Sequence, residues 1–84
     1  MATATADDIE AHENAVDFLD TFIGDLHSAW DGCSTAEKYA LHPAHIARLQ
    51  QMRADLNQML VDTTAMKLRL TLELKVLEAR PAND

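Results

Sequence analysis

The sequence is poor in the residues that cross-link a chain or turn it sharply. It has one cysteine, two glycines and two prolines among 84 residues. A single cysteine cannot form a disulfide within the chain, so Cys33 could cross-link only to another chain. Scarce glycine disfavours a sheet with tight turns, whereas the abundant alanine, leucine and glutamate favour helices. The composition predicts an all-α protein that forms one domain over residues 1–84.

Positive charge is also scarce, and the formal net charge is −7. This balance argues against binding to nucleic acid or to anionic lipid, because both need a clustered basic surface. No apolar run reaches the length of a membrane-spanning helix. Residues 1–6 lack the basic and apolar regions of a signal peptide. We therefore expect no nucleic-acid partner, no membrane insertion and no cleaved signal.

Groupings of residues typical of catalysis are missing, and there is no glycine-rich phosphate loop. His42 and His45, with Cys33 and Asp31 upstream, are residue types that bind zinc, but Pro43 interrupts the geometry between the histidines. We favour a polar loop with exposed histidines. We expect no enzyme, and no catalytic, cofactor or metal site.

A first helix is predicted over about 6–31. Its apolar residues recur at steps of three and four, a heptad pattern in which His12 fills the one missing place. Gly32 is expected to end the helix, and a loop should follow over about 32–42, where Ser34–Glu37 forms a capping box for a short helical turn. The residues expected to face the other helix are Val16, Leu19, Ile23, Leu26 and Trp30.

A second, longer helix is predicted over about 43–79, beginning with Pro43 at its first position. Pro81 stops it, and a polar tail covers 80–84. The facing residues near its start are Ile46, Leu49, Met52 and Leu56, and the stripe continues through Met59, Thr63, Met66, Leu70, Leu74 and Leu77. We interpret the methionines of this stripe as core.

Two helices joined by about ten residues should fold back as an antiparallel hairpin of unequal arms. At about 1.5 Å per residue the first helix is about 39 Å long and the second about 55 Å. With Trp30 opposite Ile46, everything after Leu68 would overhang. The region 61–77 also carries a second apolar stripe on its other side, made of Val61, Ala65, Leu68, Leu72 and Val76.

A helix that is apolar on two sides must be packed on two sides. We therefore expect the long C-terminal helix to pack in an oligomer or polymer, or against another helical protein. The residues expected to make this self-assembly or partner contact are Leu68, Leu70, Leu72, Leu74, Val76 and Leu77.

The region 68–76 also alternates between apolar and polar residues, which is the period of a strand. Leucine, glutamate, lysine and arginine are helix formers, so we favour the helix. A strand formed on assembly stays open as the alternative.

The opening of the second helix, PAHIARLQQMRADLNQ, resembles that of type III secretion needle subunits and of the related inner-rod subunits. The residues that carry this resemblance are Pro43, Ile46, Leu49, Gln50, Asp55 and Leu56. It implies a non-enzymatic structural subunit that self-assembles through its C-terminal helix. It also implies export to the cell surface by a route without a cleaved signal.

Two other interpretations stay open. Trp30-Asp-Gly32 resembles the turn of small WxG-type secreted helical hairpins. The chain could also be an acidic cytoplasmic adaptor or a type III co-chaperone that binds the helix of a partner protein. Self-association distinguishes a needle-like subunit from an adaptor, which stays soluble until its partner is added.

Overall fold

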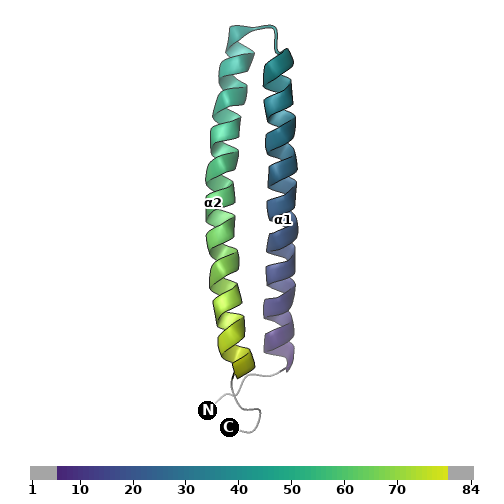
Figure 1. Ribbon diagram of the computed structural model, residues 1–84, viewed down its shortest axis with the longest axis vertical. Helices are drawn as coiled ribbons and strands as arrows, with labels where there is room; N and C mark the ends of the chain where they lie inside the picture. Colours follow the sequence, from purple (N-terminus) through teal and green to yellow (C-terminus); the bar gives the residue numbers. More distant parts are fainter. Residues whose placement is uncertain (1–5, 80–84) are drawn as a thin grey trace.

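The computed structural model describes residues 6–79, which form two antiparallel helices lying side by side (Figure 1). Helix α1 spans Ala6–Tyr39 and helix α2 spans Pro43–Ala79, with no strand in this part of the chain. The principal-axis extents are 64 × 15 × 14 Å, so the molecule is a rod. The prediction of an all-α hairpin is confirmed, while the predicted tail at 80–84 lies outside the described residues.

The predicted end of the first helix at residue 31 is wrong, because α1 continues through Gly32 for two more turns. Gly32 does not have the positive φ of a helix-ending glycine. Within the same stretch, the Thr35 hydroxyl donates to the Asp31 carbonyl at 3.0 Å, a contact made inside a continuing helix. A glycine inside a helix costs only about 1 kcal/mol. Contacts between the added turns and α2 offset that cost.

The turn is accordingly short, and the predicted loop over 32–42 is also wrong. Residues 40–42 connect the helices, and the Ser34–Glu37 capping box lies inside α1 instead of opening a new helix. The His42 carbonyl accepts hydrogen bonds from the His45 and Ile46 amides, both at 3.0 Å, which starts α2. The tight turn leaves two helices of similar length, 34 and 37 residues.

The predicted overhang after Leu68 is therefore absent. Trp30 lies beside Arg53 and not opposite Ile46, since the Arg53 guanidinium is 5.4 Å from the centre of the indole ring. Near the open end of the hairpin, His12 meets Glu73. The longer α1 shifts the pairing by about two turns, so the C-terminal half of α2 has α1 beside it along its length (Figure 1).

The line along which the helices meet, here called the seam, keeps a strict heptad over both helices. In α1 its residues are Ile9, His12, Val16, Leu19, Ile23, Leu26, Trp30, Cys33 and Glu37. In α2 they are Ile46, Leu49, Arg53, Leu56, Leu60, Thr63, Lys67, Leu70, Leu74 and Leu77. The core is thin, because within 6–79 only Leu26, Cys33 and Thr63 are buried, and each keeps a small exposed fraction.

Two predictions about the α2 stripe were wrong. Met52 is exposed beside the seam, where Arg53 takes the expected place, and Met59 and Met66 are exposed in the same way. The reason is that seam residues follow one another at alternating steps of three and four, which places Arg53 and Lys67 in the seam and the methionines directly before seam positions. Arg53 and Lys67 can occupy the seam because their side chains reach acidic partners on α1. Arg53 pairs with Glu37 at 2.9 Å and Lys67 with Asp20 at 2.6 Å.

The alternating region 68–76 is helical throughout. Leu70 and Leu74 lie on the side of α2 that meets α1, whereas Leu68 and Leu72 are exposed. The alternation therefore reflects two sides of one helix, and the strand alternative is not adopted in this hairpin.

Candidate interaction surface

Exposed apolar side chains gather along one side of the hairpin. In the middle of α1 an alanine or phenylalanine directly precedes alternate seam residues, and in the middle of α2 a methionine does so, while Asp8, His45 and Glu73 hold the same place near the helix ends. Phe18 lies next to this row in α1. In an antiparallel pair of helices these positions lie on the same side of the seam. We call this surface the apolar face, and it consists of Ala15, Phe18, Phe22, Ala29, Ala36, Met52, Met59 and Met66.

The largest side chains of the apolar face are accessible. Phe18 is 75% exposed, Phe22 41% and Met66 55%. Scattered exposed apolar side chains are normal on a protein surface, but these form a contiguous row.

Shallow hollows run along the apolar face between these side chains. One is lined by Ala29 from α1 and by Met52 and Met59 from α2, with Cys33 and Leu49 among its other lining residues. A second is lined by residues that include Ala15, Phe18 and Met66. Because each hollow is bounded by both helices, the two rows belong to one continuous surface. Its shape is that of a groove able to accept side chains from another helix.

The opposite side of the hairpin is polar. The residues directly following alternate seam positions are Glu13, Asp20, His27, Ser34, Gln50, Asn57, Thr64 and Thr71. Most acidic residues of α1 also lie toward this side, including Glu10, Asp17 and Asp31. The rod therefore has one side suited to water and one suited to another apolar surface.

The structure separates the residues predicted for assembly into two groups. Leu70, Leu74 and Leu77 are half-buried in the seam, so they hold the hairpin together and are not free for a partner. Leu68, Leu72 and Val76 are exposed on the outer side of α2. We call this second group, together with Val61, the outer stripe.

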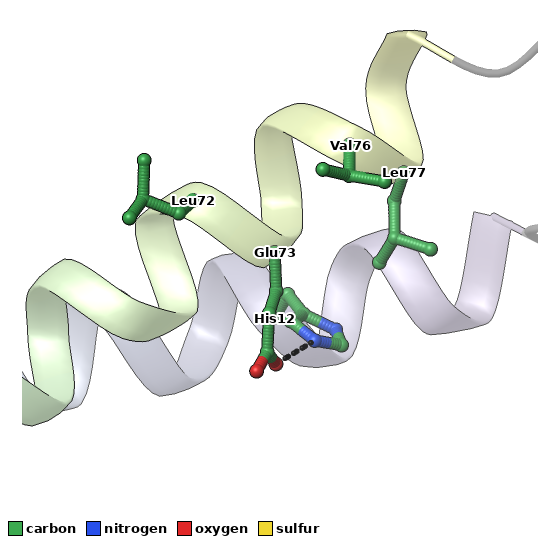
Figure 2. A pocket seen from close by; sticks show the side chains of 5 residues that line it. All are labelled: His12, Leu72, Glu73, Val76 and Leu77. Carbon is green, nitrogen blue, oxygen red and sulfur yellow. Dashed lines mark hydrogen bonds and ion pairs between the residues drawn. The ribbon is translucent and has the colours of Figure 1, made fainter.

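Near the open end, a hollow joins His12 and Glu73 with three apolar residues of α2. Figure 2 shows Leu77 turned toward α1, while Leu72 and Val76 are directed away from α1 at the edge of the hollow. The imidazole and the carboxylate point toward one another between the helices, with His12 Nε2 3.3 Å from Glu73 Oε1 (Figure 2).

The electrostatics of this pair are those of an imidazole held between acceptors. His12 Nδ1 lies 2.9 Å from the Asp8 carbonyl, and this contact, followed by that with Glu73, raises the pKa of His12 above 6.5. The Glu73 carboxylate accepts from Arg69 at 3.2 Å and from His12, which lowers its pKa below 4.5. The seam place that lacked an apolar residue thus holds a polar contact between the helices.

The residues considered for zinc do not form a site within 6–79, where no three side chains of histidine, cysteine, aspartate or glutamate come together. His42 and His45 meet ring to ring at 5.0 Å near the turn. Cys33 lies in the seam, and its thiol donates to the Leu49 carbonyl at 3.1 Å. Neither described helix has a stretch long and apolar enough to cross a membrane.

Sequence reasoning missed the apolar face because it placed the methionines in the core and ended α1 too early. A signal was present: Ala15, Phe22, Ala29 and Ala36 recur every seven residues straight across Gly32, as do the methionines of α2.

Comparisons with protein-family models, with curated proteins and with solved structures found no match.

Proposed function

We propose that the protein is a non-enzymatic assembly subunit that works by packing its helices against those of other chains. The observation that carries this proposal is the apolar face, which leaves phenylalanine and methionine side chains in water along a hairpin with a thin core. Fully burying one such side chain contributes about 1.5–3 kcal/mol. Covering several of them would contribute as much as the whole stability of a small domain, about 5–15 kcal/mol.

Self-assembly is the form of this function that we favour, as in the type III needle subunits that the opening of α2 resembles. Support comes from the second exposed surface, the outer stripe, whose Val61 and Leu68 lie on a different side of α2 from the methionines. A chain that grows into a polymer needs two distinct contact surfaces, whereas a closed pair needs one.

An adaptor or co-chaperone is the second candidate, and the methionines favour it. Three of the larger side chains lining the groove are Met52, Met59 and Met66. Methionine is flexible and polarizable, so it adapts to partner helices of varied shape. In this case a helix of a different protein would occupy the apolar face.

Sedimentation and negative-stain microscopy of the purified chain across a concentration series would test the proposal. We expect oligomers whose share of the protein increases with concentration. A chain that stays monomeric at every concentration would contradict self-assembly. The adaptor function would then remain, and binding of a defined amphipathic helix to the chain would test it.

The variants for this test must avoid the seam. Substituting Leu70 or Leu74 with aspartate would place a charge between the helices and unfold the hairpin. The exposed outer stripe offers a safer change, Leu68→Gln with Leu72→Gln, which should leave the helical content by circular dichroism unchanged. If growth beyond a small oligomer uses the outer stripe, the double variant should form only the small oligomer, while the wild type should form larger assemblies.

A further inference from the structure

We infer that the apolar face is covered by the apolar face of a second copy, forming a four-helix bundle with both turns at the same end. In this bundle the two copies are related by a two-fold axis parallel to the helices, so that α1 of each copy lies along α2 of the other. The inference rests on the proposed function, because it names the first partner of the assembly and its orientation.

The available area suits a stable dimer. A helix is about 10 Å wide, and α1 at about 1.5 Å per residue is about 50 Å long. The apolar face runs from Ala15 to Ala36, about 33 Å, so two helices side by side present about 650 Å² per copy, or about 1,300 Å² in the pair, which is the lower part of the range for specific stable interfaces. A single added helix would cover only part of this face.

The charges of the two helices favour a dimer in which α1 of one copy packs against α2 of the other. Nine acidic residues against one lysine give α1 a net charge of −8, whereas five basic against four acidic residues give α2 a net charge of +1. Turns at the same end place each acidic helix over a nearly neutral one. Turns at opposite ends would place α1 over α1, so two strongly acidic helices would repel one another.

The positions of the acidic residues reduce the cost of bringing two copies together. Most acids of α1 lie toward the polar side, away from the apolar face. Asp25 is the acid of α1 that lies beside Phe18 and Phe22 on that surface, and from α2 one acid and one base, Asp55 and Arg69, line its hollows. The net charge of the chain therefore does not concentrate at the proposed contact.

Side-chain size leads to the same orientation. The α1 side of the apolar face carries Ala15, Ala29 and Ala36 around the phenylalanines, and the α2 side carries three methionines at the matching places in its middle. Helices packed through alanine approach closely, and those packed through methionine stay further apart. Alanine over methionine gives the two contacts between copies the same spacing, but α1 over α1 and α2 over α2 would not.

The levels of these residues also interleave. Asp20 is level with Lys67 through their ion pair, and Trp30 is level with Arg53, so Phe22 lies at a level between Val61 and Ala65, in the interval from Met59 to Met66. Ala29 shares a hollow with Met52 and Met59. An axis parallel to the rod keeps each residue at its own level. Phe22 and Ala29 of one copy therefore enter the gaps between successive methionines of the other.

A spin-label distance at the turn would test the orientation. Leu41 is highly exposed in the turn, so Leu41→Cys in a Cys33→Ser background places one label per chain. Turns at the same end predict a distance below about 25 Å, since the two layers of helices lie about 10 Å apart and the label arms add to this. Turns at opposite ends predict a distance approaching the 64 Å length of the rod, which would overturn the inference.

A pair of matched variants distinguishes failure of this inference from failure of the proposed function. Phe22→Gln with Met59→Gln alters the apolar face, and Val61→Gln with Leu68→Gln alters the outer stripe by a similar loss of apolar surface. We expect the first pair to raise the dimer dissociation constant by roughly 100-fold or more. The second pair should leave that constant within about threefold.

The opposite result, in which only the outer-stripe pair prevents dimers, would refute the inference while keeping self-assembly. If the labelled Leu41→Cys chain shows no dipolar coupling and the wild type sediments as a monomer at every concentration, both are refuted. Circular dichroism on each variant checks that the helices persist, as expected for substitutions at exposed positions.

Discussion

At the scale of single residues, His12 shows how a polar group occupies an otherwise apolar seam. Both ring nitrogens face acceptors, one on the Asp8 carbonyl and one on Glu73. The doubly protonated imidazolium can donate to both at once, whereas the neutral ring can donate to only one. The raised pKa of His12 follows from this arrangement.

Changing Glu73 to glutamine should lower the pKa of His12, because it removes the carboxylate that stabilises the imidazolium. The value should stay somewhat above 6.5, since the Asp8 carbonyl contact, the larger cause of the shift, remains. NMR titration of the histidine ring protons in the two proteins measures this. Equal pKa values would mean that the two side chains do not interact in solution.

The same pair sets a pH dependence of stability. His12 has its pKa raised in the folded chain, so its contribution is complete below 6.5 and is lost as the pH rises through the folded value. Glu73 has its pKa lowered, so its contribution is present above 4.5 and is lost on acidification. For this pair, urea denaturation should show both contributions together between pH 4.5 and 6.5. Below that window the wild type should lose its advantage over Glu73→Gln, whereas above it only the part that comes from His12 is lost and the part that comes from Arg69 remains.

Leu26 is the best test of the thin core, because it is only 4% exposed. Leu26→Ala should lower the free energy of unfolding by about 2–4 kcal/mol, from lost burial and an unfilled cavity. Leu68→Ala is the matched control, since Leu68 is 60% exposed, and it should cost less than about 1 kcal/mol. Urea denaturation at low protein concentration compares them, and equal losses would contradict the assigned seam.

At the scale of elements, the length of α1 decides the whole arrangement. Continuation of α1 through Gly32 shortens the turn to residues 40–42 and matches the two helices. The local signals at Gly32 and at Ser34–Glu37 favour a break, but each is worth only about 1 kcal/mol. Burial of Cys33 and the Glu37–Arg53 ion pair belong to the extended helix alone.

Gly32→Ala tests this continuation directly. A Cβ at Gly32 meets nothing within 4 Å, and the backbone is helical, so alanine should stabilise the chain by about 0.5–1 kcal/mol. Gly24→Ala, also in α1 with open space around it, should give a similar gain. Thermal unfolding followed by circular dichroism measures both. Destabilisation at Gly32 alone would indicate a left-handed helix end there.

At the scale of the whole molecule, the hairpin is a rod with few fully buried side chains and one long apolar side. Such a chain gains stability from any partner that covers this side, because the partner binds the folded state and not the unfolded one. Folding and association should therefore be coupled.

The midpoint temperature of unfolding should rise by several degrees as the protein concentration increases. Phe22→Gln with Met59→Gln is the matched control, and its midpoint should stay constant over the same range because it no longer associates. Scanning calorimetry at graded concentrations makes the comparison. A wild-type midpoint independent of concentration would show that association does not contribute to stability.

The sequence by itself determined the helical class, the single hairpin, the start of α2 at Pro43 and the heptad seam of α1 from Ile9 to Trp30. These follow from residue propensities and from spacing within one helix, both of which are local. The excess of apolar side chains over what one hairpin can bury was also readable from the two sides of 61–77.

Only the tertiary structure decided where α1 ends, which residues of α2 face it and which apolar side chains remain exposed. The break signals at Gly32 are weak and local, while the contacts that override them join residues distant in sequence, such as Glu37 with Arg53 and Asp20 with Lys67. The register of those contacts placed Leu70, Leu74 and Leu77 in the seam and left the methionines outside it. The position of the exposed surface is thus a consequence of how two helices pair, which spacing along either helix alone does not contain.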